Sequence, residues 1–379
     1  MARRLRIQLL HGRKVYHPGQ ALVGTVIIQL RDSIIAHAVH LTVHGMSLAS
    51  VADVHSSNYN ENVTHINHRI DLWTAFDDIT VLPMGHHSFH FSYCLPLQLP
   101  SSIEFHESSS FITSKVGTIR YWLTATVNRP RHFNLQTKLP FTVIEYIDVN
   151  DASLLHSMMS ENEKTLCCCC CASGPLVLTA SVDRMGYCPG EKATISTIAE
   201  NVGNRRVTGL RARLIAATTL SLTLKETTSL TTVSVLEERP IPPRHTIMWQ
   251  QKKLTIPPLP PTNLKCRMIS RDYYIQVELI VAKGINLETY FPIVVGSVPF
   301  KQTSEIKKTI CIDSTVPKES RQRWPIPLTS SVPTTVPQLT VWNNPLVDMA
   351  GNDQGTYGSM QWVYCTNQHL RTTPHTQDT

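Results

Sequence analysis

The chain has 379 residues, of which 42% are hydrophobic and 17% are charged, and its formal net charge is +7. This length is sufficient for two globular domains that each bury a core. The basic residues are scattered, with no aromatic-interleaved stripe, zinc-finger spacing or recognition-helix pattern, so nucleic acid is not an expected partner. A mildly basic surface suits acidic lipids or phosphorylated tails and is equally typical of an ordinary cytosolic protein.

The N-terminal segment MARRLRIQLL lacks the apolar core of a signal peptide, because the polar sequence HGRK follows at once. No run of about 18 apolar residues predicts a membrane-spanning helix. Of the ten cysteines, five are contiguous and the others lie far apart, which is not the spacing of a disulfide framework. These features predict a cytoplasmic location.

The first half of the chain consists of short β-rich segments separated by turn residues. Alternation of apolar and polar residues and an excess of β-branched and aromatic side chains predict strands. The polar segment 47–67 is interpreted as a long loop or a flexible hairpin. The expected strands of this half are 5–10, 21–30, the segment around 39–43, 65–74, 87–91, 117–127 and 139–149.

One short frame occurs twice, as Tyr16-His17-Pro18-Gly19-Gln20 and as Tyr187-Cys188-Pro189-Gly190-Glu191. Proline fixes φ for the second position of a tight turn and glycine accepts positive φ at the third, so Pro18-Gly19 and Pro189-Gly190 predict type II turns. Each copy precedes a β-rich run. The repeat therefore indicates two similarly built β domains in tandem.

The second half repeats the pattern of short strands, with proline-rich breaks between them. Helical periodicity is weak throughout, which favours an all-β fold of antiparallel sandwiches over a parallel α/β sheet. From residue 303 the pattern fades into a Pro-, Ser- and Thr-rich flexible tail, expected to be disordered. Strands are expected near 176–183, 192–201, 207–219, 246–256, 272–282 and 288–298. The expected domains are 1–149, a linker at 150–174 that contains the cysteine cluster, a second domain at 175–302, and the tail at 303–379.

A series of motifs, each a turn followed by a strand, resembles the α-arrestins, or arrestin domain-containing proteins, over about residues 5 to 300. The motifs are YHPGQ (16–20), LPMGHHSFHF (82–91), LPSS (99–102), GTIRYW (117–122), RP (129–130), FTVIE (141–145), KTLC (164–167), SGP (173–175), YCPGE (187–191), IPP (256–258) and LETYFPIVVG (287–296). Together their order and spacing are specific, although each alone is a common signal.

This resemblance implies two arrestin-type, immunoglobulin-like β-sandwiches joined by a short hinge. It also implies a non-enzymatic adaptor that engages cytoplasmic segments of membrane receptors or transporters and directs their endocytosis or endosomal sorting. Recruitment from the cytoplasm to the plasma membrane and to endosomes is then expected. Peripheral contact with the membrane follows from the same role.

α-Arrestins commonly recruit WW-domain-bearing HECT ubiquitin ligases through Pro-Pro-x-Tyr, because a preformed polyproline segment docks at little entropic cost. This sequence has no Pro-Pro-x-Tyr, so direct ligase recruitment does not follow from the resemblance. The segment Pro257-Pro258-Leu259-Pro260 is a candidate WW ligand, although it lies between expected strands. Two alternative functions stay open: a retromer-type coat or sorting subunit that shares the arrestin fold, and a thioredoxin-linked regulator acting through a free cysteine. Neither Cys266 nor Cys311 has the basic or helix-N-terminal setting that marks a reactive thiol.

The cysteine cluster consists of Cys167, Cys168, Cys169, Cys170 and Cys171. A zinc site is disfavoured, because adjacent cysteines on a strand point to opposite faces and a tetrahedral site takes paired elements from two places. The cluster is a candidate site of S-acylation, which would strengthen membrane anchoring. The structural alternative is that these small side chains pack an interdomain strand.

No nucleophile elbow, P-loop, dinucleotide fingerprint or zinc-protease motif occurs, so neither an enzyme nor a cofactor is expected. The many histidines lack the spacing and the acidic neighbours of a metal site, so no metal is expected either. Arg120 and Arg184 lie on expected strands, where a charge must be paired. Glu145 and Asp183 are the candidate partners.

Overall fold

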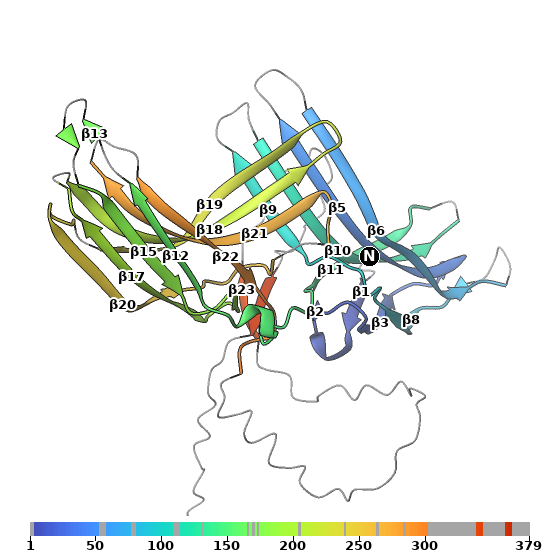
Figure 1. Ribbon diagram of the computed structural model, residues 1–379. Coiled ribbons are helices and arrows are strands. Elements are labelled where there is room, and N and C mark those ends of the chain that lie inside the picture. Colours follow the sequence, from blue (N-terminus) through green and yellow to red (C-terminus); the bar gives the residue numbers. More distant parts are fainter. Residues whose placement is uncertain are drawn as a thin grey trace, which may run out of the picture.

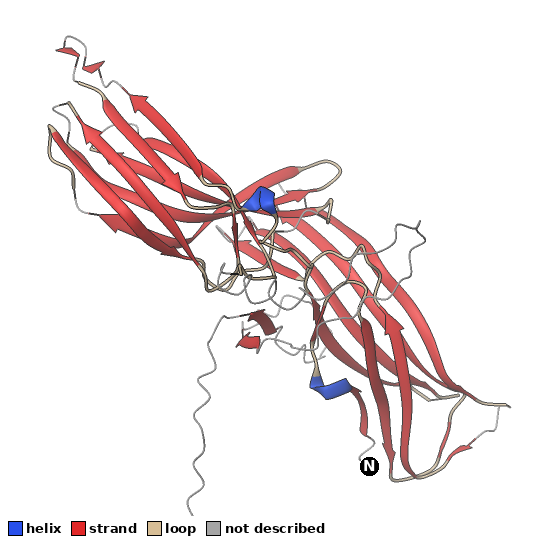
Figure 2. Cartoon of the chain, turned by 60° about the horizontal axis from the view of Figure 1, so that its bottom comes forward, coloured by secondary structure: helices blue, strands red, loops and turns tan. Residues whose placement is uncertain are grey.

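The computed structural model describes residues 4–301, apart from 53–57, 77–80, 109–113, 131, 165–166, 169–170, 173, 204–205, 239, 263–264 and 283–285, together with residues 339–343 and 361–365. Within these residues the helices are two single turns, η1 (Leu10–Gly12) and η2 (Ala152–Leu154). Figures 1 and 2 show an elongated body in which two β-sandwiches meet near its middle. The predicted all-β architecture of two tandem sandwiches is confirmed.

The first sandwich packs a three-stranded sheet, β1-β3-β8, against a larger sheet in the order β2-β11-β10-β5-β6, with β9 paired to β10. Alternate residues along β3 and β5 are buried between the sheets, as the apolar alternation predicts. Its strands are β1 (Arg4–Leu9), β2 (Val15–Tyr16), β3 (Ala21–Leu30), β4 (Ile34–Ile35), β5 (Ala38–Ala52), β6 (Asn58–Thr74), β7 (Val81–Leu82), β8 (Gly85–Cys94), β9 (Ile103–Ser108), β10 (Ser114–Asn128) and β11 (Leu135–Val143).

The second sandwich repeats this plan. A four-stranded sheet, β12-β15-β17-β20, faces a five-stranded sheet, β16-β22-β21-β18-β19. In both sandwiches a two-residue strand that ends at the tyrosine of the repeated frame pairs in parallel with the last long strand, as β2 with β11 and β16 with β22. Its strands are β12 (Met158–Lys164), β13 (Cys167–Cys168), β14 (Cys171–Ala172), β15 (Leu176–Val182), β16 (Gly186–Tyr187), β17 (Lys192–Asn201), β18 (Val207–Ser221), β19 (Glu226–Glu238), β20 (His245–Thr255), β21 (Ile269–Val281) and β22 (Leu287–Val295).

The repeated Pro-Gly frame forms the same turn in both sandwiches. Gly19 has φ of 82° and Gly190 has φ of 89°, the left-handed values that the third position of a type II turn requires. In each copy the N–H of the fourth turn residue, Gln20 or Glu191, donates to the carbonyl oxygen of the first at 3.1 Å. The turns lead directly into β3 and β17, so the repeat marks equivalent places in the two domains.

A side-chain brace stabilises each turn from within. Oε1 of Gln20 accepts hydrogen bonds from Arg13 Nη2 at 2.6 Å and from the first backbone N–H of the turn at 2.9 Å. In the second turn Glu191 Oε2 accepts hydrogen bonds from Arg184 Nη2 and from the backbone N–H of Cys188, each at 2.9 Å. Glu191 Oε1 accepts a third from the backbone N–H of Phe300 at 3.0 Å. The second brace therefore contains a charge-assisted pair that the first replaces with a neutral amide.

A second repeated contact holds the chain segment that precedes the long central strand. Tyr121 donates its hydroxyl to the carbonyl oxygen of Pro100 at 2.7 Å, and Tyr273 donates to that of Pro260 at 2.6 Å. Both tyrosines are fully buried, so a partner for each hydroxyl is required. The two sandwiches thus share packing details as well as strand order.

The segment 47–67, interpreted as a long loop or a flexible hairpin, is a hairpin: its described residues belong to β5 and β6, which pair in antiparallel register. Its apolar signal is weak because β5 buries small side chains such as Gly45, Ser47 and Ala49. Two expectations about the chain path require correction. Residues 158–164, expected in the linker, form β12 and pair with β15. Strand β19, a 13-residue edge strand rich in threonine and serine, was not predicted.

Most of the expected tail lies outside the described residues. Within it, β23 (Leu339–Asn343) and β24 (Gln361–Cys365) pair as an antiparallel two-stranded sheet. The Pro-, Ser- and Thr-rich sequence of this segment does not predict these strands.

Candidate functional site: the joint between the sandwiches

Two connecting segments run side by side where the sandwiches meet. After β11 the chain continues through residues 144–149, and after β22 it continues through residues 296–301. Ser297 accepts a hydrogen bond from the backbone N–H of Ile147 at 2.9 Å and donates its hydroxyl to the carbonyl oxygen of Glu145 at 2.7 Å. Asn150 donates to the carbonyl oxygen of Pro299 at 3.0 Å and accepts from the backbone N–H of Lys301 at 2.8 Å. These bonds tie the exit of the second sandwich to the exit of the first.

The β18–β19 hairpin forms a second, larger contact. Figure 1 shows it extending from the second sandwich toward β5, β9 and β10 of the first. Five residues of the second half are buried in the hydrophobic core of the first sandwich: Leu220, Leu222, Cys266, Met268 and Ile269. Gly117 on β10 lies against this contact, and a Cβ built there would be 2.7 Å from Cδ2 of Leu220. The joint is therefore a shared apolar core and not a flexible tether.

A polar contact lies beside this core, formed by Glu107, Lys115 and Ser229. Lys115 Nζ is 3.0 Å from a Glu107 carboxylate oxygen and donates to Ser229 Oγ at 2.9 Å. The Ser229 hydroxyl donates to the same carboxylate. These hydrogen bonds, first that of Ser229 and then that of Lys115, lower the pKa of Glu107. Because Ser229 belongs to β19, the contact links the two sandwiches.

We expect Glu107→Gln to weaken this contact in a pH-dependent way. A lowered folded-state pKa means that the carboxylate adds stability above its ordinary pKa and that this stability is lost as pH falls through the lowered value. The side chain is 40% exposed, so the loss at neutral pH should be within about 1 kcal/mol. Chemical unfolding measured at several pH values checks this.

The control is Glu104→Gln, because Glu104 pairs with Arg120 inside the first sandwich, at 3.0 Å. That variant should leave hydrogen exchange in β19 unchanged, whereas Glu107→Gln should accelerate it. If the difference in free energy of unfolding between wild type and Glu107→Gln stayed the same at acid pH, the Glu107 carboxylate would not be the source of the stability.

Glu145 is a buried carboxylate at the joint, only 4% exposed. Its Oε1 has no hydrogen-bond partner among the described residues. Burial raises its pKa, against the smaller opposing effects of Lys265 and of a hydrogen bond from the Ser101 backbone. An ionised carboxylate in this position costs stability, because part of its hydration is not replaced.

We expect Glu145→Gln to stabilise the protein at neutral pH by about 1 kcal/mol. A raised folded-state pKa means that wild type loses stability as pH rises through that pKa, while the glutamine variant does not. The stability advantage of Glu145→Gln over wild type should therefore decrease as the pH is lowered toward the ordinary pKa of a carboxyl group. Thermal unfolding between acid and neutral pH measures it, and a variant less stable than wild type throughout that range would contradict the prediction.

The two arginines singled out in the sequence are both paired, but with other partners than expected. Arg120 pairs with Glu104, and Arg184 pairs with Glu191 at 2.9 Å. Glu145 lies at the joint instead, and Asp183 accepts the hydroxyl of Tyr187 at 2.6 Å. The expected pairings were wrong because the true partners lie across a ladder or a turn, which linear spacing does not reveal.

The segment Pro257-Pro258-Leu259-Pro260 does not present a WW ligand. Leu259 is 7% exposed and packs in the core of the second sandwich, and Pro260 is buried. The carbonyl oxygen of Pro260 is the acceptor for Tyr273 described above. Docking in the groove of another protein would require these residues to leave the folded sandwich, so this interpretation is corrected to a structural role.

The cysteine cluster occupies a hairpin between β12 and β15. Its backbone forms β13 and β14, paired at Cys168 and Cys171, while the remainder of the cluster and all five side chains lie outside the described residues. Figure 1 places β13 at the end of the second sandwich that is remote from the joint. The expectation that the cluster packs an interdomain strand is therefore wrong, because β12 carries the chain away from the linker to this end.

The described thiols outside this cluster are Cys94, Cys188 and Cys266. Cys266 is 5% exposed within the joint and Cys188 is 1% exposed in the second turn. A mixed disulfide with Cys266 would require the joint to open. Cys311 lies outside the described residues.

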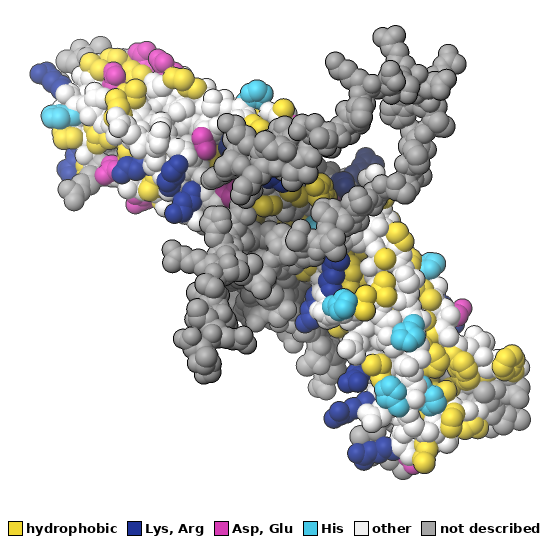
Figure 3. All heavy atoms as spheres, turned by 90° about the horizontal axis from the view of Figure 1, so that it is seen from below, with side chains coloured by type: hydrophobic (Ala, Val, Ile, Leu, Met, Phe, Trp, Pro, Cys, Tyr) yellow, Lys and Arg dark blue, Asp and Glu magenta, His cyan; other side chains and the backbone are white. Residues whose placement is uncertain are grey.

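Histidine side chains gather on the first sandwich (Figure 3), where several are held by neighbouring side chains. His44 stacks on Trp122 and His68 stacks on Tyr93, each with ring centroids 4.9 Å apart. His65 Nε2 lies 3.1 Å from Ser47 Oγ. In the part of the chain that the structure describes, no group of three or more His, Cys, Asp or Glu residues is placed to hold a metal ion.

Comparison with known sequences matches each sandwich to a family. Residues 5–150 match the arrestin (or S-antigen) N-terminal domain, and residues 172–300 match the arrestin (or S-antigen) C-terminal domain. The chain belongs to the α-arrestin family. Among the α-arrestin relatives, human Arrestin domain-containing protein 4 is 28% identical over 297 residues, which cover 75% of this chain and 69% of that protein.

Two further relatives extend the comparison. Arrestin domain-containing protein 17 of Caenorhabditis elegans is 27% identical over 315 residues, covering 78% of this chain and 71% of that protein. Mouse Arrestin domain-containing protein 1 is 26% identical over 301 residues, which cover 78% of this chain and 65% of that protein. This α-arrestin is accordingly an adaptor of the arrestin family. Within its described residues, no helix has the length and apolar character needed to cross a membrane.

Proposed function

We propose that this α-arrestin is a non-enzymatic cytoplasmic adaptor that binds cytoplasmic segments of membrane receptors or transporters and directs their endocytosis or endosomal sorting. The observation that supports this most directly is the shared core of the joint, which makes two sandwiches into one extended body. Such a body offers sheet edges and loops from both domains to one partner. Family membership supports the same role.

The free edge of β6 is the proposed cargo-binding element. Among the described residues only β5 pairs with it, so one side of this 17-residue strand has no ladder partner. Edge strands are usually protected by lysine, proline or a cover. Strand β6 contains neither lysine nor proline, and its residues Asn60 and Asn62 are exposed. An extended cargo segment can add to such an edge through main-chain hydrogen bonds.

Proximity labelling in cells with the full chain tests the proposal. The neighbours of the wild-type protein should include integral membrane receptors or transporters. A variant with Asn60→Lys and Asn62→Lys should lose these neighbours, because lysine on an edge strand disfavours pairing with a further strand. The matched control places the same two charges at the exposed Thr246 and Thr255 on β20. Retention of these neighbours by the β6 variant would contradict cargo binding at this edge.

Membrane attachment through S-acylation of Cys167–Cys171 is the second part of the proposal. The position of the β13–β14 hairpin, remote from the joint, supports access by an acyltransferase at a membrane surface (Figure 1). Several acyl chains would convert weak into stable anchoring. Hydroxylamine-sensitive acyl exchange should label the wild-type protein and not a variant with all five cysteines changed to serine. Equal labelling of the two proteins would contradict acylation here.

The proximity-labelling experiment also distinguishes the cargo-adaptor role from the two alternative functions. Coat subunits in fixed stoichiometry would favour a retromer-type role, and thioredoxin captured through Cys266 would favour a redox-linked role. Direct recruitment of a HECT ligase is not part of the proposal, because the sequence lacks Pro-Pro-x-Tyr and the segment at 257–260 is built into the core.

A further inference from the structure

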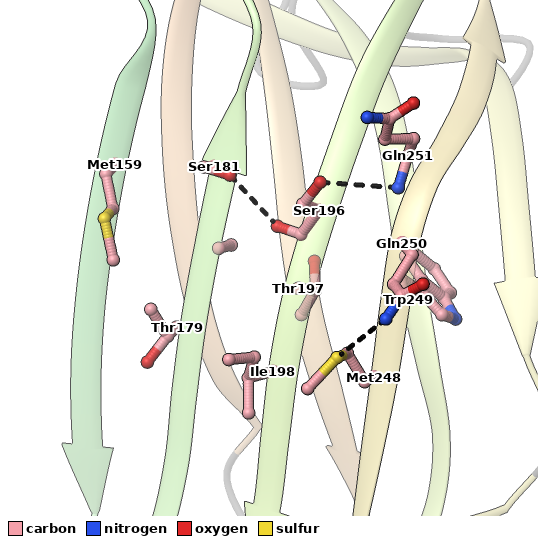
Figure 4. Close-up of a pocket in the computed structure, with 11 residues that line it drawn as sticks. Met159, Thr179, Ser181, Ser196, Thr197, Ile198, Met248, Trp249, Gln250 and Gln251 are labelled. Carbon is pink, nitrogen blue, oxygen red and sulfur yellow. Dashed lines mark hydrogen bonds between the residues drawn. The ribbon is translucent and has the colours of Figure 1, made fainter.

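The outer face of the sheet β12-β15-β17-β20 contains a groove of about 530 Å³ (Figure 4). Its floor carries the small polar side chains of Thr179, Ser181 and Ser196, whose strands pair directly. Exposed apolar side chains border it: Met159, Ile198 and Met248. Methionine adapts to irregular partners, and exposed apolar side chains gathered around a hollow indicate a binding surface.

A β-bulge shapes this groove. The register of β17 with β20 shifts between Ile195 and Thr197, so that Gln250 and Gln251 lie opposite the single residue Ser196. Gln251 has φ of 51°, a left-handed value that is uncommon outside glycine, and its backbone N–H donates to Ser196 Oγ at 3.4 Å. A bulge bends its strand, which here hollows the face between β17 and β20.

Charges of opposite sign lie at the two ends of the groove. Glu163 and Glu200 flank Val177 from the neighbouring strands, and Glu161 lies in the next outward row, with Thr179. At the end near the joint, Lys192 lies on β17 and Lys253 Nζ donates to Thr194 Oγ1 at 2.7 Å. None of the three glutamates forms an ion pair with another described residue. The surface therefore favours a segment with an apolar part and a cationic end.

Figure 3 shows the corresponding face of the second sandwich, on which hydrophobic, acidic and basic side chains lie close together. We propose that residues 318–328 of the same chain, KESRQRWPIPL, dock in this groove. The segment places Lys318, Arg321 and Arg323, with one acidic residue between them, directly before the apolar residues Trp324, Ile326 and Leu328. The cations face Glu161, Glu163 and Glu200, and the apolar side chains pack on the methionines and Ile198.

Proline determines how this segment binds. Pro325 and Pro327 exclude a helix and restrict the residues before them to extended conformations. In an extended segment Trp324, Ile326 and Leu328 share one face, with about 6–7 Å between neighbours, which is also the spacing of outward residues along β17. Prolines lack the N–H needed to extend a sheet at its edge. The segment therefore lies on the sheet face.

The length of chain outside the described body allows this docking. The second sandwich ends at Lys301, beside the joint, and 16 residues separate it from Lys318. Sixteen extended residues span up to about 53–58 Å. The ten residues of β17 span about 33 Å, so the segment can reach the glutamate end of the groove and return along it. Docking is independent of the proposed cargo binding at β6.

Photo-crosslinking in the full chain tests the docking. Trp324 is replaced by p-benzoylphenylalanine, a benzophenone side chain that inserts into nearby C–H bonds, and the crosslinked peptides are identified by mass spectrometry. We expect crosslinks to the peptides that contain Met159, Ile198 or Met248, with a yield independent of protein concentration. The triple variant Glu161→Lys, Glu163→Lys and Glu200→Lys should lower that yield at least fivefold.

A charge swap is the matched control. Adding Lys318→Glu, Arg321→Glu and Arg323→Glu to the triple variant should restore the crosslinks, and thermal unfolding should show that both variants remain folded. Crosslinks to other surfaces would overturn the proposal. A crosslinking yield that is unchanged by the glutamate-to-lysine variant, or that is not restored by the charge swap, would overturn it too. Crosslinks between molecules that grow with concentration would overturn it as well, since they would show that the groove binds a second copy.

Discussion

Leu220→Ala is expected to lower the free energy of unfolding by about 2–5 kcal/mol, the usual cost of truncating a fully buried leucine. Leu220 is fully buried and belongs to the core of the first sandwich although it lies on β18 of the second. The cavity would form between the domains, so the variant should also loosen the joint. Calorimetry should show the unfolding transition broadening or dividing, and small-angle scattering should show a larger radius of gyration.

The same hairpin supplies the control. Leu224 is 81% exposed at the hairpin turn, so Leu224→Ala should change the free energy of unfolding by no more than about 0.5 kcal/mol. If Leu220→Ala were as mild as Leu224→Ala, the hairpin would not be packed in the first sandwich in solution.

Gly296→Ala is expected to cost about 1–3 kcal/mol, because the added methyl group would overpack the two connecting segments. A Cβ at this position would enter the side chain of Val149 and lie 2.8 Å from the carbonyl oxygen of Ile147. The backbone cannot retreat freely, since the Gly296 N–H donates to the carbonyl oxygen of Tyr187 at 2.8 Å. Chemical unfolding measures the loss, and hydrogen exchange in residues 144–149 should rise.

Gly209→Ala is the comparison for this variant. A Cβ at Gly209 would come no closer than 3.4 Å to a neighbour, which is ordinary contact. Gly209→Ala should therefore be markedly milder than Gly296→Ala. Equal effects would show that the loss arises from glycine replacement in general and not from crowding at the joint.

The two-sandwich fold was predictable because its signals are local. The Pro-Gly frames at 18–19 and 189–190 prescribe a turn through φ alone, and the alternating residues of β3 and β15 show their buried face directly. Their repetition half a chain apart indicates a duplicated domain without knowledge of any long-range contact. Motif order then pointed to the family that the comparisons show.

The joint was not predictable, because its contacts join residues far apart in the chain. Ser229 on the hairpin contacts Glu107 and Lys115, which precede it by 122 and 114 residues, and none of the three stands out in its own segment. Strand β19 was missed since its threonines and serines give no clear apolar alternation. A signal does exist in β18, where the run LIAATTLSL continues past the length needed for one sandwich, but periodicity cannot say what it contacts.

The arginine partners illustrate the same limit at shorter range. Arg184 and Glu191 are seven residues apart and meet only because the Pro-Gly turn reverses the chain. The WW interpretation of 257–260 likewise failed because burial of Leu259 depends on the opposite sheet. Composition identifies a segment that can bind a groove, whereas exposure decides whether it does.

Insertion of the β18–β19 hairpin into the first sandwich has a consequence for how the protein can be divided. A fragment that ends at the linker would leave the core of the first sandwich without Leu220, Leu222, Cys266, Met268 and Ile269, which the second half supplies. Such a half should be aggregation-prone and retained by chaperones, while the complementary half would expose Leu220 and Ile269. Although the two halves are built on one duplicated plan, we therefore expect neither to fold stably alone, and we expect the N-terminal half to complete its core only after the C-terminal half has left the ribosome.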